Sequence, residues 1–193
     1  MKTMKSILML CVGLLFISNC FAQSEKIEWI KKDAKLTYDV NTKKANYLFM
    51  VSITNTKPDL AFNFEMTDAN KIKGNVNMSE EALKNAVKFN NYFRPGELLL
   101  TDMTTVWVSK KVYSYLKKGQ EIMVDFGDGE EGLKFKGNEK MSFKINDSKK
   151  EYNVLLSETE SGKKMWVLDN AENPLILKMD LGWSIEIKSV EFK

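Results

Sequence analysis

The chemistry open to this chain is limited by the absence of histidine. Ser-His-Asp and Cys-His catalysis, histidine-ligated zinc and histidine-based pH switching are therefore excluded. Carboxylates remain, and two of them about 5 to 9.5 Å apart can hydrolyse a glycosidic bond. Six acids are available for such a pair, namely Asp39, Glu65, Asp102, Asp125, Asp169 and Glu172. Their spacing selects no particular pair, so a carboxylate-dependent glycan hydrolase is kept as an alternative hypothesis.

Residues 125–132 read Asp-Phe-Gly-Asp-Gly-Glu-Glu-Gly and place four acids and three glycines in eight positions. Calcium favours clustered carboxylates on a flexible backbone, which makes Asp125, Asp128 and Glu130 candidate ligands. The spacing departs from that of an EF-hand loop, where acids alternate before a glycine and a distant glutamate closes the loop. We therefore expect a solvated hairpin tip, with no metal ion and no cofactor.

Trp107 and Trp166 are the candidate ligand-binding residues, because each is flanked on both sides by apolar neighbours. Successive side chains of a strand point to opposite faces, so both faces of the sheet would be apolar at these places. A helix covering the second face of the sheet would account for this pattern. A cavity lined by the tryptophans is the other explanation, and it motivates a hypothesis of ligand binding.

Residues 1–22 have the order of a secretory signal peptide: an early positive charge, an apolar run over residues 7–17, and small residues before a cleavage site that ends at Ala22. The apolar run is shorter than the about 20 residues that a membrane-spanning helix needs. The four residues that end at Cys20 (Ile-Ser-Asn-Cys) resemble the lipobox of bacterial lipoproteins. Lipidation of Cys20 would anchor the protein to a membrane.

Cleavage after Ala22 removes Lys2 and Lys5 but no acid, so the net charge falls from +3 to +1. Such a balance argues against a nucleic-acid partner, which requires a basic face. Cys11 and Cys20 are the two cysteines of the chain, so the mature form has no disulfide or thiol chemistry. The chain has no second apolar run long enough to predict a transmembrane span. The expected location is the periplasm or outer envelope of a Gram-negative bacterium, or the medium, with membrane association if Cys20 is lipidated.

Apolar residues alternate with a period of two in most of the chain, which predicts strands. The clearest runs are residues 47–54, 60–66, 122–126, 141–145, 152–156, 175–180 and 183–188. After Ile187 the phase changes, which indicates a bulge near Ser189 or a frayed end. Two helices are expected: one capped by Ser79 that continues toward Pro95, and one from Ser109 to Gly119.

These elements predict one mainly β domain over residues 23–193. We expect a curved antiparallel sheet or a partly open β-barrel with two short helices. A two-sheet β-sandwich is the alternative.

Two segments carry a resemblance to a known group of proteins. Residues 107–113 read Trp-Val-Ser-Lys-Lys-Val-Tyr, and residues 168–177 read Leu-Asp-Asn-Ala-Glu-Asn-Pro-Leu-Ile-Leu. Residues 97–193 thereby resemble uncharacterised exported bacterial β-rich domains, in which a final hairpin has an Asp-rich turn before an Asn-Pro-Leu strand. The resemblance implies an exported β domain of unknown function, similar in build to periplasmic half-barrels, and assigns no catalytic residue.

The first hypothesis for function is therefore a non-enzymatic, exported envelope or periplasmic protein that binds a small apolar ligand or a protein partner. The glycan hydrolase described above is one alternative. A structural lipoprotein anchored through Cys20 is the other.

Overall fold

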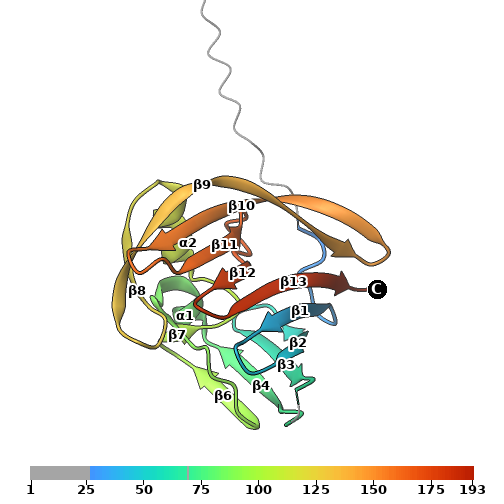
Figure 1. Ribbon diagram of the computed structural model, residues 1–193. Helices are drawn as coiled ribbons and strands as arrows, with labels where there is room; N and C mark the ends of the chain where they lie inside the picture. The colour runs from blue at the N-terminus through green and yellow to red at the C-terminus, as the bar shows by residue number, and fades with distance from the viewer. Residues whose placement is uncertain (1–26, 69) are drawn as a thin grey trace, which may run out of the picture.

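The computed structural model describes residues 27–68 and 70–193. The predicted signal peptide of residues 1–22, including Cys20, lies outside the described residues. In the part of the chain that is described, thirteen strands form one continuous sheet, and two short helices pack on it (Figure 1).

The first half of the chain forms an antiparallel meander, extended by one parallel strand beside β4. Its strands are β1 (Lys35–Asn41), β2 (Asn46–Asn55), β3 (Leu60–Met66), β4 (Lys73–Met78) and β6 (Gly96–Leu100). One face of the meander is buried at every second residue, for example at Phe49, Val51 and Ile53 in β2. The period-two pattern of the sequence therefore does set the buried face of this half.

The second half continues the sheet through consecutive antiparallel strands. They are β8 (Ile122–Asp125), β9 (Glu130–Ile145), β10 (Ser148–Thr159), β11 (Lys164–Leu168), β12 (Ile176–Asp180) and β13 (Ser184–Glu191). The long β9–β10 hairpin arches over the other strands, as Figure 1 shows. Two short parallel strands, β5 (Lys88–Phe89) and β7 (Met103–Thr104), complete the sheet beside β8.

Strand β13 has three partners and connects the two halves. It pairs with β12 through Ser184–Glu186 and with β1 along most of its length, and its last residues pair in parallel with the end of β9. The last pairing closes β9 to β13 into a ring of five strands. The register of β13 against β1 slips at Lys188. Ile187 and Val190 are therefore both buried, although they differ in the phase of the period-two alternation. The predicted bulge is confirmed, and it bends β13 from one partner toward the other.

Both helices begin where the sequence predicts. Ser79 caps α1 (Glu80–Asn85) by accepting a hydrogen bond from the Ala82 amide at 3.1 Å. Ser109 caps α2 (Lys110–Lys117) in the same way, through the Val112 amide at 3.2 Å.

The expected continuation of α1 toward Pro95 is wrong, because the helix ends at Asn85. From Ala86 the backbone is extended, and the Val87 carbonyl accepts a hydrogen bond from the Asp125 amide at 3.0 Å. The next two residues form β5. Pairing with a distant strand therefore overrides the helical pattern of this segment.

Two apolar cores lie on opposite faces of β10 to β12. Val154 belongs to the larger core, which the meander covers, and its neighbour Leu155 belongs to the smaller one. In the smaller core Met165 and Val167 of β11 share a cluster with α2 residues, including Val112 and Leu116. The expectation that a helix covers the second face of the sheet is confirmed around β11.

The predicted class, a mainly β chain with a curved sheet and two short helices, is confirmed. The sheet is single and continuous, so the sandwich alternative does not apply. Parallel pairs also occur, notably β4 with β6 and β13 with β9, although the sequence pattern predicts antiparallel neighbours.

Replacement of Gly74 tests the packing of β4 against β6. A Cβ atom at Gly74 would collide with the backbone oxygen of Gly96 and would lie 2.8 Å from the Phe64 ring. We expect Gly74→Ala to lower the free energy of unfolding by roughly 1–3 kcal/mol, as overpacking does. Gly137→Ala is the matched control, because its Cβ would meet no atom within 4 Å, and its effect should stay within about 0.5 kcal/mol. Urea denaturation of the three proteins measures the difference, and equal stability of the two variants would contradict this account of the packing.

Candidate ligand-binding cleft

The segment between β7 and α2 is buried although it has no regular secondary structure. Its backbone is held by the segment that precedes and begins β12. The Val108 amide donates to the Pro174 carbonyl at 3.0 Å, and the Val106 carbonyl accepts from the Ile176 amide at 2.8 Å. Trp107 lies between these bonds and forms a β-bridge with Leu175. The two segments that carry the sequence resemblance are therefore neighbours in space.

Val106 has a strained backbone. Its φ is +62°, which is rare for a β-branched residue, and the Trp107 amide donates to the Thr105 carbonyl at 2.6 Å across it. A three-residue turn of this kind costs on the order of 1–3 kcal/mol. The bonds to Pro174 and Ile176 hold the turn in place, and the turn sets the position of Trp107.

Trp107 forms part of the wall of a cleft of about 980 Å³. This volume lies at the upper end of the range for small-molecule sites. Apolar side chains make up half of its lining: Ile27, Ile30, Pro58, Leu60, Leu83, Trp107, Val108 and Pro174. The polar members are Thr56, Asn170 and Asn173, and the charged ones are Lys57, Lys84, Lys110, Glu80 and Glu172. The cleft therefore combines an apolar wall with charged groups.

The indole N–H of Trp107 has no hydrogen-bond partner within the described residues, and only 1% of the side chain is exposed. A buried unpaired donor costs about 1–3 kcal/mol. The N–H groups of Trp29 and Trp166, by contrast, donate to the Tyr152 hydroxyl at 3.0 Å and the Glu139 carboxylate at 2.8 Å.

Trp166, the second tryptophan candidate, does not line this cleft. It lies on β11, half-buried, where its ring is 5.2 Å from the Lys178 ammonium. Lys178 in turn forms an ion pair with Glu186 at 2.7 Å. The structure does not bring Trp107 and Trp166 together, and Trp107 is the one that lies beside a cavity.

The N-terminus of α2 lies at the cleft, because Val108 and Lys110 both line it. The first turn of α2 contains Lys110 and Lys111 and no acid, whereas that of α1 contains Glu80 and Glu81. Cations at the positive end of a helix dipole are unfavourable by about 0.3–1 kcal/mol each. The first turn of α2 therefore supplies no acid of its own to offset the positive end of the helix dipole.

The turn between β11 and β12 forms hydrogen bonds with the C-terminal half of α2. The Asp169 carboxylate accepts hydrogen bonds from the Tyr113 hydroxyl at 2.8 Å and from the Lys117 ammonium at 2.7 and 2.8 Å. Burial, and then this hydrogen bond, raise the pKa of Tyr113. One residue on, the Asn170 side chain accepts from the Asn173 amide at 2.9 Å. This turn fixes α2 against the wall of the cleft.

Of the six carboxylates considered for glycan hydrolysis, Asp169 and Glu172 share the β11–β12 turn, and the other four come from separate parts of the chain. Five of them pair with lysines: Asp39 with Lys188, Glu65 with Lys73, Asp102 with Lys88, Asp169 with Lys117 and Glu172 with Lys110. Asp125 instead accepts hydrogen bonds from two amides of its own loop. No hydrogen bond joins any two of the six in the described chain.

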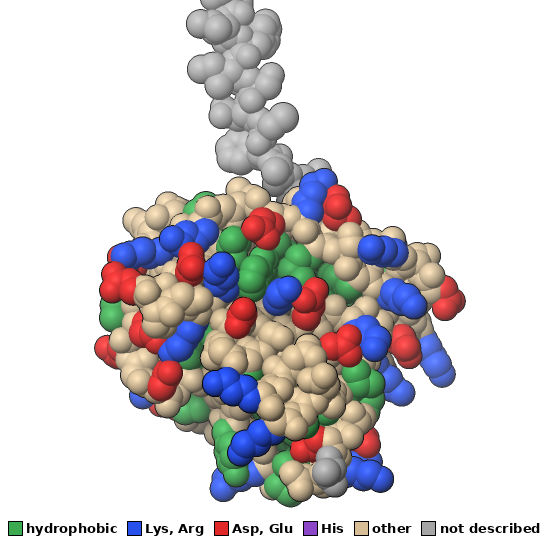
Figure 2. All heavy atoms as spheres, in the orientation of Figure 1, with side chains coloured by type: hydrophobic (Ala, Val, Ile, Leu, Met, Phe, Trp, Pro, Cys, Tyr) green, Lys and Arg blue, Asp and Glu red, His purple; other side chains and the backbone are tan. Residues whose placement is uncertain are grey.

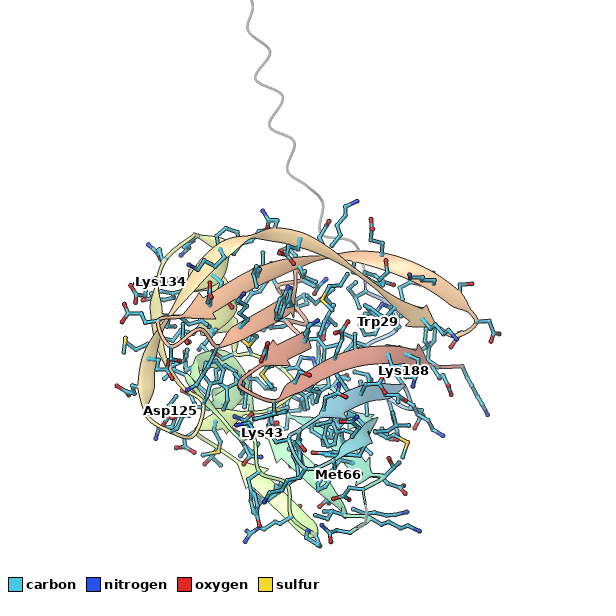
Figure 3. The ribbon with its side chains drawn as sticks, viewed as in Figure 1. Trp29, Lys43, Met66, Asp125, Lys134 and Lys188 are labelled. Atoms are coloured by element: carbon cyan, nitrogen blue, oxygen red, sulfur yellow. The ribbon has the colours of Figure 1, made fainter. Side chains whose placement is uncertain are left out.

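The calcium candidates lie at the β8–β9 tip, where Figure 3 places Asp125 far from Trp29. Asp125 accepts from the Gly127 and Gly129 amides at 2.7 and 3.1 Å, and Glu130 begins β9. Asp128 forms an ion pair with Lys163 at 2.8 Å. Among the described residues, no group of three or more acids or cysteines is arranged to hold a metal ion.

Lys163 contacts this tip, although the sequence pattern does not indicate it. It comes from the β10–β11 turn and bonds both Asp128 and Glu131. The hydrogen bond from Lys163, and then that from Ser161, lower the pKa of Glu131 to about 2. The tip is therefore an ion-pair network between two neighbouring turns.

A second hollow, of about 770 Å³, lies against the meander. Its lining is mainly polar and comes from alternate residues of adjacent strands, among them Lys35, Ser52, Asn63 and Asn75. Figure 2 shows charged side chains of both signs mixed over the visible face, with apolar ones gathered between them over β11 and β12. The Trp107 cleft is the candidate site, because there a hollow coincides with strained backbone and an unpaired buried donor.

Comparisons with known proteins add no assignment: no family model, no curated protein and no solved structure matches this chain. Neither described helix has the length and apolar character needed to cross a membrane.

The Glu131 network gives stability a defined dependence on pH. The pKa of Glu131 is about 2 in the folded protein, against an ordinary value of 4.5. The contribution of its charge is therefore present above pH 4.5 and is lost as the pH falls toward 2. We expect Glu131→Gln to destabilise the protein at pH 6, with a difference from wild type that shrinks between pH 4.5 and 2.

Urea denaturation across this pH range measures the effect. Glu130→Gln is the control, because the Glu130 side chain makes no hydrogen bond or ion pair with the described residues, and its effect at pH 6 should stay within about 0.5 kcal/mol. A Glu131→Gln difference that is the same at pH 6 and pH 2.5 would contradict the assignment.

Proposed function

We propose that this protein is a non-enzymatic, exported protein of the periplasm or outer envelope that binds a small apolar ligand in the Trp107 cleft. The observation that carries the proposal is a cleft of about 980 Å³ in which half of the lining residues are apolar, beside the strained backbone at Val106. Export rests on the signal-peptide pattern of residues 1–22.

The apolar wall supplies a driving force for binding. Each Å² of apolar ligand surface removed from water contributes roughly 25 cal/mol. Leu60 belongs to β3 and Leu83 to α1, and both are packed in or against the larger core. The turn at Val106 is fixed by hydrogen bonds to the β12 segment. A site on such rigid elements loses little entropy on binding, which favours affinity.

The two alternatives receive no comparable support. A carboxylate hydrolase needs an acid and a base on either side of one bond, and the six candidate carboxylates are each engaged with a lysine or with their own loop. The lipoprotein hypothesis depends on Cys20, which lies outside the described residues. It is compatible with ligand binding, because an anchor at Cys20 leaves the cleft unchanged.

A neutral fluorescent probe, 1-aminoanthracene, tests the proposal on the exported protein. We expect one probe per chain, bound with micromolar affinity and accompanied by a change in tryptophan emission. Leu83→Gln puts a polar group into the wall and should weaken binding about tenfold, which corresponds to about 1.4 kcal/mol. Leu99→Gln is the matched control, since Leu99 is 64% exposed and does not line the cleft.

Equal affinities of wild type and Leu83→Gln would place the probe elsewhere. The absence of binding by the probe, long-chain alcohols and long-chain acids together would reject the proposal. A protein partner would then be the remaining form of the first hypothesis.

A further inference from the structure

The edge of the sheet at β6 is open. β6 is the last strand at this end of the sheet, and within the described chain it pairs with β4 alone. Figure 1 shows β6 at the border of the meander. The opposite end of the sheet is β7, which is two residues long and ends at the buried Thr104. An open strand edge presents backbone N–H and C=O groups with which another strand can pair.

The backbone groups that face outward at this edge belong to Glu97 and Leu99. The Leu100 carbonyl accepts a hydrogen bond from the Ser79 amide at 3.0 Å, directly after β4, so the backbone groups of Leu100 face β4. Backbone groups of successive residues in a strand point to opposite sides, so those of Leu98 also face β4. The groups of Glu97 and Leu99 therefore point away from the sheet, and no described residue pairs with them.

The side chains at this edge are those of a contact surface. Tyr92 and Leu99 are the two most exposed large apolar side chains of the described chain, at 74% and 64%. β6 reads Gly-Glu-Leu-Leu-Leu and contains no lysine or proline, which are residues that protect edge strands from pairing. Arg94, the one arginine of the chain, is exposed and forms no ion pair with the described residues. Tyrosine and arginine are enriched where proteins contact each other.

The segment is complementary to a second copy of itself. Arg94 lies two residues before β6, and Asp102 lies two residues after it. Antiparallel pairing of two β6 strands about a twofold axis at Leu98 brings the Arg94 end of each copy to the Asp102 end of the other. The same register sets Glu97 opposite Leu99, so each such pair exchanges both of its N–H···O bonds. A register centred on Glu97 would place two carboxylates opposite each other, which is unfavourable.

We propose that this protein forms a symmetric dimer in which the β6 strands of two copies pair in antiparallel orientation and join their sheets. At each end of the paired strands, Arg94 of one copy forms an ion pair with Asp102 of the other. Asp102 is available for this contact, because its ion pair with Lys88 is long, at 3.5 Å, and exposed. No residue of β6 lines the Trp107 cleft, so the dimer does not depend on the proposed function.

Sedimentation velocity of the exported protein over a range of concentrations tests the proposal. The interface of one strand pair is small, so we expect a reversible dimer with a dissociation constant of about 10–100 μM. The Glu97 and Leu99 amides should exchange with solvent about tenfold more slowly once about nine-tenths of the chains are paired. Exchange of the Leu98 amide, which faces β4, should not depend on concentration.

Charge reversal tests the register. Arg94→Glu and Asp102→Arg should each weaken dimerisation at least about tenfold, because each variant places like charges at both ends of the paired strands. An equimolar mixture of the two variants should restore dimerisation, since a mixed dimer has opposite charges at both ends. Lys118→Glu is the matched control: it makes the same charge change at an exposed position at the C-terminus of α2, and it should leave the dimer unchanged.

A protein that stays monomeric up to about 1 mM, well above the expected dissociation constant, would overturn the proposal. So would a dimer that Arg94→Glu leaves unchanged, or one in which the Glu97 and Leu99 amides exchange as fast as in the monomer, because the interface would then lie elsewhere. If both variants weaken the dimer and their mixture does not restore it, the antiparallel register is refuted.

Discussion

The rest of the structure depends on the backbone hydrogen bonds of β13. This strand pairs with β12, β1 and β9, so it both closes the five-stranded ring and attaches the meander to it. One extended strand can follow three partners because the bulge at Lys188 bends it and keeps Ile187 and Val190 buried. Without this pairing the meander and the ring would each expose an unpaired edge and part of the larger core.

The position of the cleft follows from this arrangement. Trp107 packs against Phe62 of the meander, with ring centroids 5.9 Å apart, while its backbone is bridged to Leu175 just before β12. The strained turn at Val106 and the buried indole N–H both occur where the two halves of the molecule meet. Strain and unpaired polar groups are unfavourable for folding, and proteins retain them most often at functional sites.

The two helices contribute to the cleft in different ways. Leu83 and Lys84 of α1 supply wall and charge, whereas α2 presents the end of its backbone. The acidic turn at Asp169 has a structural role, because it holds α2 through hydrogen bonds from Tyr113 and Lys117. In the same way, the acidic tip of residues 125–132 is tied by Lys163 to the neighbouring turn.

The sequence by itself determined what depends on neighbours along the chain. Alternation predicted strands where the structure has β2, β3, β8, β9, β10, β12 and β13. The caps Ser79 and Ser109 predicted both helix starts, and the apolar neighbours of Trp166 indicated a covered second face. Tertiary structure alone decided the end of α1, the closure of the ring and the cleft. The cleft lining comes from five separate stretches of chain, from Ile27 to Pro174. They meet through strand pairings such as that of β13 with β9, and backbone hydrogen bonds of this kind leave no local pattern in side chains.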